Sequence, residues 1–143
     1  RAPLWAIGAD YDHGTGHGVG SYLGVHEGPQ RISKVSNSIA LQPGMILSNE
    51  PGYYRSGAYG IRLENLLVVK SEVIPNADRK MLSFETITLA PFDTSMIIEE
   101  LLADHEKNWL NDYHEWVRKE LLPLLNNDES AWLIEATEPI GSE

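Results

Sequence analysis

Three histidines stand close together near the start of the chain. His13, His17 and His26 lie in the segment ADYDHGTGHGVGSYLGVHEGP, residues 9–29. The residues between them are mostly glycine, threonine, serine and valine, so this segment is predicted to be strand and loop rather than helix. It therefore differs from the helical H-E-x-x-H arrangement of zinc peptidases. A neutral imidazole on such a segment is a common kind of metal ligand.

Glycines alternate through the same segment, at Gly14, Gly16, Gly18 and Gly20. The dinucleotide-binding pattern G-x-G-x-x-G needs a third glycine where this chain has Val19. The phosphate-binding loop also needs a lysine that the segment lacks. The spacing therefore does not indicate a nucleotide site.

Two carboxylates further along the chain are placed to approach each other. Glu50 and Glu64 lie seven residues either side of Gly57 in GMILSNEPGYYRSGAYGIRLENLLVV, residues 44–69. If the strands on either side of that glycine pair antiparallel, the two carboxylates come together. A carboxylate within an apolar strand needs a cation or hydrogen bonds to compensate its burial, and two of them repel. A positive group is therefore expected between them.

The segment itself is predicted to form two strands. Met45-Ile46-Leu47 begins a buried strand that Pro51-Gly52 ends, residues 55–60 form a turn, and residues 61–69 form the second strand.

One imidazole with two carboxylates is a mixed nitrogen and oxygen ligand set. Such sets suit Mn²⁺, Co²⁺, Zn²⁺ or Fe²⁺ bound in pairs. A paired site would activate a water and polarise a carbonyl, which is the chemistry of amide hydrolysis. The spacing also allows a structural alternative, in which His17 packs in the interior and Glu64 pairs with Arg62. The residues alone leave both open.

The glycine content and the spacing of apolar residues change after about residue 81. All of the glycines except Gly141 lie in residues 1–81, which suits strands and turns. Residues 82–92 are predicted to form one more strand, ended by Pro91. From Asp93 the apolar period becomes helical. We expect two parts, residues 1–81 and residues 82–143.

The clearest helix is predicted after Asp104, a suitable N-cap. An apolar stripe at spacings of three and four is broadened by two tryptophans. A second helix is predicted from Glu129 to Ala136. The tryptophans and Tyr113 are expected in the core, and His105 and His114 are expected to be ordinary helix residues. The stripe consists of Leu110, Tyr113, Val117, Leu121 and Leu124, with Trp109 and Trp116 beside it.

Composition excludes several classes of protein. The net charge of -10 over 143 residues argues against nucleic acid as a partner and against attachment to an anionic membrane surface. The absence of cysteine excludes disulfides and thiolate chemistry and is consistent with a reducing compartment. No apolar run is long enough to span a bilayer. A chain that begins at Arg1, with no methionine or signal peptide, is expected to be a piece of a longer protein.

The motifs, taken in order, resemble those of the pita-bread metallopeptidases and most closely those of Xaa-Pro aminopeptidases. The later segments resemble the C-terminal extension of the three-domain, cytosolic-type aminopeptidase P. The resemblance covers nearly all of the chain. The first group of motifs is HGTGHGVG (13–20), VHEGP (25–29), GMILSNEPGYY (44–54) and GIRLEN (60–65), and the second group is TITLAPFD (86–93), WLNDYH (109–114) and WLIEATEPI (132–140).

The resemblance implies roles for particular residues. His17 and Glu50 are similar to metal ligands, and Glu64 is similar to a carboxylate that bridges two metals. His26 is similar to a histidine that transfers protons beside the scissile bond. His13 is similar to a histidine that contacts the substrate or the developing oxyanion.

Two further residues, Tyr54 and Arg62, are similar to residues that hydrogen-bond around the metal ligands and fix their geometry. The same resemblance implies five protein ligands, two of them aspartates upstream of the histidine motif. Asp10 and Asp12 lie inside that motif instead. The chain alone is therefore expected to be inactive.

The fold implied is α+β, the C-terminal half of a pita-bread fold with a curved antiparallel sheet flanked by helices. Half of such a fold would expose the apolar surface that the other half covers, so the chain is expected to self-associate or to exchange elements with a second copy. The extension also implies a homodimer.

The activity implied for the whole protein is hydrolysis of the bond between an N-terminal residue and proline, in peptides with proline in the second position. It would use two divalent ions, Mn²⁺ first, with Zn²⁺ and Co²⁺ as alternatives, and a cytoplasmic location. Two other functions stay open. A proline dipeptidase would cleave only dipeptides, and a non-catalytic binding module would keep the fold without activity.

Overall fold

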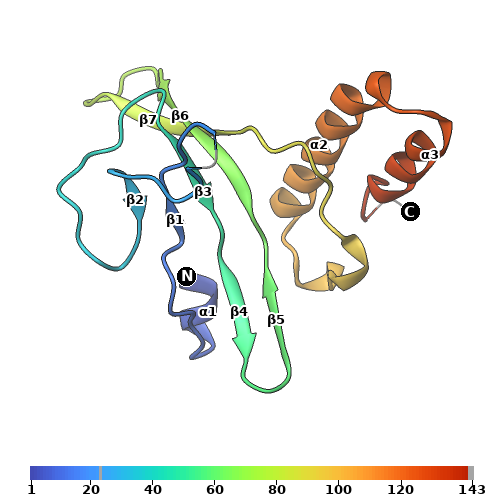
Figure 1. Cartoon of the computed structure of the whole chain (residues 1–143), viewed down its shortest axis with the longest axis horizontal. Helices are drawn as coiled ribbons and strands as arrows, with labels where there is room; N and C mark the ends of the chain where they lie inside the picture. The colour runs from blue at the N-terminus through green and yellow to red at the C-terminus, as the bar shows by residue number, and fades with distance from the viewer. Residues whose placement is uncertain (23, 142–143) are drawn as a thin grey trace. The chain divides into compact units, whose positions relative to one another are not determined.

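The structure is a computed structural model that describes residues 1–22 and 24–141. The chain divides into two compact units, residues 1–88 and residues 89–143. The strands lie in the first unit and the two long helices lie in the second (Figure 1). No helix among the described residues is long and apolar enough to cross a membrane. In chain order the elements are α1 (Ala2–Ala6), β1 (Gly16–His17), β2 (Arg31–Ile32), β3 (Ile46–Asn49), β4 (Gly52–Arg55), β5 (Tyr59–Arg62), β6 (Asn65–Glu72), β7 (Met81–Thr86), the 3₁₀ turns η1 (Thr94–Met96) and η2 (Glu99–Leu101), α2 (Asp104–Leu121), η3 (Leu122–Leu124) and α3 (Asn127–Ala136).

The largest sheet of the first unit has the strand order β3-β6-β7, with both pairs antiparallel. Its buried hydrophobic side chains are Leu47 on β3 and Leu67 and Val69 on β6. Alternate residues of β6 are buried, which is the period of a strand with one covered face. The antiparallel sheet of the predicted α+β class is confirmed.

The two predicted strands around Gly57 pair as expected but are each interrupted once. β3 continues into β4, and β5 leads into β6, so that β4 and β5 form a hairpin beyond the larger sheet (Figure 1). Gly57 has a φ of +72°, which glycine adopts without strain, and it lies in the tip of this hairpin. The predicted end of the first strand at Pro51-Gly52 is confirmed, since β3 ends at Asn49, but the strand β4 that follows was not predicted. Proline has no N–H to donate, so it interrupts the ladder, which resumes at once in β4.

The register is the same on both sides of the interruption. Asn49 stands opposite Asn65 in the larger sheet, and Gly52 stands opposite Arg62 in the hairpin. Glu50 therefore lies opposite Glu64.

A short pair of strands, β1 and β2, lies against β3. Gly16 of β1 approaches β3 so closely that a Cβ at this position would stand 2.0 Å from the carbonyl oxygen of Ser48. Only glycine permits this approach. The close contact sets the next residue, His17, against the end of β3.

The predicted strand over residues 82–92 is shorter in the structure, since β7 ends at Thr86. The N–H of Ile87 donates to the carbonyl of Leu66, at 2.9 Å, and completes the pairing with β6. Beyond residue 88 the chain enters the second unit. The boundary between units follows the last residues that pair with β6.

Both predicted helices are confirmed, with small differences at their starts. Asp104 is the first helical residue of α2 rather than its N-cap, which is Ala103. The carboxylate of Glu106 accepts a hydrogen bond from the N–H of Ala103, at 2.8 Å. α3 starts earlier than predicted, because the side-chain oxygen of Asn126 accepts from two backbone N–H groups and caps the helix.

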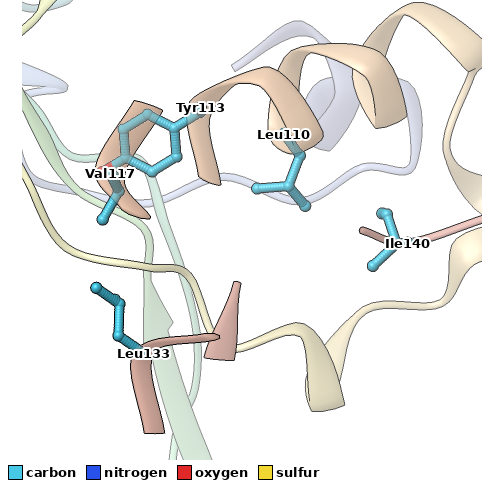
Figure 2. Close-up of a cluster of buried hydrophobic side chains, with 5 residues drawn as sticks. All are labelled: Leu110, Tyr113, Val117, Leu133 and Ile140. Carbon is cyan, nitrogen blue, oxygen red and sulfur yellow. The ribbon is translucent and has the colours of Figure 1, made fainter. Parts of the chain in front are cut away.

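The core of the second unit joins α2 to α3 and to the segment after it. Figure 2 shows Leu110, Tyr113 and Val117 of α2 with Leu133 of α3 and Ile140. The three positions of the predicted stripe among them, Leu110, Tyr113 and Val117, are confirmed as core residues.

The remaining stripe residues are less buried. Leu121 packs at the margin of the core, but Leu124 is 77% exposed because it lies beyond α2 in η3. Trp116 is half-buried against the core. The expectation that the tryptophans are core residues is wrong for Trp109, which is half-exposed on α2, and for Trp132 and Trp5, which are 59% and 55% exposed.

His114 is fully buried, so describing it as an ordinary helix residue is wrong. Its Nε2 accepts a hydrogen bond from the N–H of Phe92, at 3.0 Å. Burial, and then the charge of Arg118, lower the pKa of His114 below its ordinary value. The imidazole is therefore a neutral structural group that fixes the segment leading to α2.

Candidate metal centre and its surroundings

His17 and Glu50 meet at the end of β3. The Nε2 atom of His17 lies 2.9 Å from Oε1 of Glu50. The Nδ1 atom of the same ring lies 2.8 Å from the carbonyl oxygen of Gly18. A carbonyl oxygen only accepts, so we infer that Nδ1 carries the hydrogen.

It follows that Nε2 of the neutral ring presents a lone pair to a carboxylate oxygen. Two lone pairs at this separation need a cation, either a proton on the ring or a metal ion. Two donors bound to one ion at about 2.1 Å each stand roughly 3 Å apart, which is close to the spacing seen here. The pair therefore fits a divalent ion.

The Glu50 side chain is buried and held from several sides. Ser48 Oγ donates to Oε1 at 2.9 Å, and Arg62 Nη1 donates to Oε2 at 3.0 Å. The N–H of Glu50 donates to the carbonyl of Thr15, at 2.7 Å. The first two bonds fix the carboxylate to β3 and to the hairpin, and the third fixes the backbone of Glu50 to the segment before His17.

Glu64 lines the same cavity, of about 580 Å³, as His17 and Glu50. Yet among residues 1–22 and 24–141 no three histidine, aspartate or glutamate side chains lie close enough together to hold one ion. The structure thus brings two of the predicted ligands into contact and places the third on the same cavity wall. The structural alternative also needs correction, because the ion pair of Arg62 is with Glu50 rather than with Glu64.

His13, Tyr54 and Arg62 form a hydrogen-bonded chain that ends on Glu50. Nδ1 of His13 lies 2.7 Å from the Gly14 carbonyl, so Nδ1 carries the hydrogen and Nε2 accepts. The Tyr54 hydroxyl, 2.7 Å from that Nε2, therefore donates to it. Arg62 Nε in turn donates to the Tyr54 oxygen at 2.9 Å.

The pKa of Arg62 is raised, first by this bond to Tyr54 and then by the charges of Glu50 and Glu64. A permanent positive charge thus lies beside the two facing carboxylates, as their spacing in the sequence required. The sequence predicts a positive group here, and Arg62 is one.

His26 lies in the loop after β1, and its ring is beside that of His17. Its ring centroid lies 4.3 Å from that of His17. It lines the cavity shared with Glu64 and also an adjoining cavity of about 400 Å³ that contains His13. Two backbone bonds hold this loop beside β1: the N–H of Glu27 donates to the carbonyl of Gly18, at 2.9 Å, and the N–H of Gly18 donates to the carbonyl of Gln30, at 3.0 Å.

Three residues that support this centre, Ser48, Tyr11 and Thr15, were not predicted from the sequence. Ser48 is fully buried and binds both members of the pair, since its Oγ also accepts from the N–H of His17 at 3.1 Å. Tyr11, 2% exposed, places its hydroxyl 2.7 Å from Thr15 Oγ1. A polar serine within an apolar strand, two residues before a carboxylate, was the one signal available for Ser48.

Comparison with known proteins identifies the family. Residues 1–71 match the family described as "Metallopeptidase family M24", and residues 80–140 match the one described as "C-terminal region of peptidase_M24". The chain belongs to the metallopeptidase family M24. The division between these two matches falls before β7, although β7 pairs with β6.

Particular relatives are Xaa-Pro aminopeptidases. The chain is 51% identical to a probable Xaa-Pro aminopeptidase P of Coprinopsis cinerea, over 98% of this chain and 24% of the relative. It is 51% identical to aminopeptidase P1 of Lotus japonicus, over 99% of this chain and 22% of the relative. The chain thus spans about a quarter of the length of the curated relatives it matches.

A solved structure is also similar. The X-prolyl aminopeptidase of Caenorhabditis elegans, described as a cytosolic enzyme with a di-nuclear active site, superposes with a TM-score of 0.89 at 42% identity. The match covers 98% of this chain and 23% of that one. The expected fold, part of a pita-bread metallopeptidase of the Xaa-Pro aminopeptidase kind, is confirmed.

Proposed function

We propose that this chain is the C-terminal part of a dinuclear Xaa-Pro aminopeptidase, which hydrolyses the bond between an N-terminal residue and proline. The observation that carries the proposal is the His17–Glu50 pair, in which a ring nitrogen and a carboxylate oxygen stand 2.9 Å apart at the wall of a cavity that Glu64 also lines. Its relatives by sequence and by structure are Xaa-Pro aminopeptidases, which supports the same substrate class.

In this chain His17, Glu50 and Glu64 would hold the metal, with Glu64 in the bridging role. The other ligands, two aspartates, come from the part of the whole protein that precedes this chain. Mn²⁺ is the proposed metal, with Zn²⁺ and Co²⁺ as alternatives, since a mixed nitrogen and oxygen donor set suits all three. Such ions, when bound, lower the pKa of a water and polarise the carbonyl of the scissile bond.

The other residues have separate tasks. His26, whose ring lies 4.3 Å from that of His17, transfers protons beside the scissile bond. His13 lies at the wall of the adjoining cavity and contacts the substrate or the developing oxyanion there. Arg62 holds Glu50, and Tyr54 holds His13.

The chain is one part of an active enzyme and inactive alone. Residues 1–81 belong to its catalytic domain, and residues 82–143 form its C-terminal extension. The whole protein is a cytoplasmic homodimer. Support for the location comes from the Caenorhabditis elegans relative, described as cytosolic.

The test uses the full-length protein that contains this chain. Metal-depleted protein, incubated with Mn²⁺ and desalted, should retain two ions per chain and cleave Xaa-Pro-Xaa peptides. Glu64→Gln should retain fewer ions and lose activity, while Glu72→Gln, an exposed carboxylate at the far end of β6, should match the wild type.

The outcomes separate the alternatives. Cleavage of Xaa-Pro dipeptides alone would indicate a proline dipeptidase. Retention of neither metal nor activity by correctly folded full-length protein would indicate a binding module and refute the proposal. Metal retained by the isolated chain would show that three ligands suffice for binding.

A further inference from the structure

Arg1 is an almost fully buried charge that no catalytic role accounts for. Its side chain is 8% exposed. The guanidinium lies over the ring of Tyr11, with Cζ 3.7 Å from the ring centroid. A charge removed from water in this way is stable only when its N–H groups are paired.

The N–H groups of Arg1 are paired along one short segment. Nη1 donates to the carbonyl of Tyr11, at 2.6 Å, and to the carboxylate of Asp10. Nη2 donates to the carbonyl of His13. One planar group thus binds three points of residues 10–13 from two nitrogens, whereas an ammonium would have to reach all three from a single nitrogen.

These contacts converge on His13. Its carbonyl is held by Arg1, and its ring packs against the ring of Tyr11, with 4.7 Å between centroids. The Tyr11 hydroxyl lies 2.7 Å from Thr15 Oγ1, so the segment is fixed on both sides of His13. The imidazole can then reach Tyr54 and the cavity wall in one orientation.

The anchor for Arg1 stays charged. Lys34, and then Trp5, the N–H of Tyr11 and Arg1 itself, hold the pKa of Asp10 well below its ordinary value. Lys34 Nζ binds the other carboxylate oxygen, at 2.8 Å, and is half-exposed. Lys34 therefore contacts the same carboxylate as Arg1 and provides a matched control.

We propose that Arg1 is a positioning residue, which fixes the backbone of residues 10–13 so that the His13 imidazole faces the substrate side of the cavity. This inference rests on the proposed function for the role of His13. The geometric part of it, the fixing of residues 10–13, can be tested without any activity.

The first test is hydrogen exchange by mass spectrometry on the full-length protein. Arg1→Ala should raise exchange in peptides covering Tyr11–His17 by about 10-fold, because local opening becomes easier when buried contacts are lost. Arg1→Lys, which keeps the charge but not the planar fork, should give an intermediate increase. Lys34→Ala should leave those peptides unchanged. Equal exchange in wild type and Arg1→Ala would overturn the proposal.

The second test is a double-mutant cycle on cleavage of an Xaa-Pro-Xaa peptide. Arg1→Ala should lower kcat about 10-fold with KM changed less than about 2-fold, since it displaces a group that acts during the reaction. In a His13→Ala background, Arg1→Ala should add less than about a 2-fold loss. Full additivity would show that Arg1 acts by some other route and would also overturn the proposal. If the wild type cleaves no such peptide, the proposed function fails, while the exchange result still decides whether Arg1 fixes the segment.

Discussion

The close approach of Gly16 to β3 gives a quantitative prediction. In Gly16→Ala the methyl carbon would stand 2.0 Å from the carbonyl oxygen of Ser48, whereas ordinary contact begins at 3.4 Å. The backbone fixes the position of the methyl carbon, and its partner is a backbone oxygen, so no side-chain rotation relieves the clash. The two strands must therefore separate by about 1.4 Å.

That displacement falls on the next residue, His17, whose Nε2 lies 2.9 Å from Glu50. Two ligands that share one ion tolerate little change in spacing, because bonds to nitrogen and oxygen are about 2.0 to 2.2 Å long. A misplacement of about 1 Å can cost about 100-fold in rate. We expect Gly16→Ala to lose bound Mn²⁺ and about 100-fold in kcat/KM.

The assay measures metal content by elemental mass spectrometry and peptide cleavage on the full-length protein. Gly14→Ala is the matched control, since its methyl would stand 3.4 Å from the nearest atom, the carbonyl oxygen of Ile32, and should change activity by less than about 3-fold. A folded Gly16→Ala protein with wild-type metal content and activity would refute the reasoning. It would mean that β1 can move away from Ser48 without taking His17 with it.

Three further predictions concern the second unit and can be followed by chemical denaturation with tryptophan fluorescence. Leu133→Ala should destabilise it by about 2 to 5 kcal/mol, because this buried leucine leaves a cavity, whereas Leu124→Ala, which is exposed, should cost less than about 0.5 kcal/mol. Asn126→Ala should cost about 1 kcal/mol through the loss of two cap bonds to α3, and no change would show that the cap is dispensable. The depressed pKa of His114 means that the unfolded state binds a proton first, so stability should be full above pH 6.5 and fall as the pH drops below it. His114→Gln should show a shallower loss over that range, and an unchanged slope would argue against a buried neutral imidazole that accepts from Phe92.

The sequence predicted best those features that depend on local spacing. The facing of Glu50 and Glu64 followed from their equal distance to Gly57, since a hairpin fixes register from its turn outwards. The stripe of Leu110, Tyr113 and Val117 followed from the helical period alone. Such features need no knowledge of the rest of the chain.

Features that depend on distant parts of the chain were not predictable. The contact between His17 and Glu50 requires β1 to lie on β3, and the spacing of the two residues says nothing about this. The burial of His114 depends on a bond from Phe92, 22 residues earlier. Trp109 and Trp132 were expected in the core with the other tryptophans, but both lie off the buried positions of α2 and α3.

The pairing of β7 with β6 has a consequence for how this family could be shortened. β7 lies in the part of the chain that matches the C-terminal region. Its backbone nevertheless hydrogen-bonds to the edge of β6, which lies mostly in the part that matches the peptidase. A protein trimmed at residue 71, the limit of the peptidase match, would leave the N–H and C=O groups of Leu67 to Ser71 that face β7 without partners. An uncovered strand of this kind recruits other chains and promotes aggregation. A boundary placed between the two family matches would therefore cut through a sheet. A soluble shortened protein would have to keep β7, or carry charged residues or proline on the exposed edge of β6.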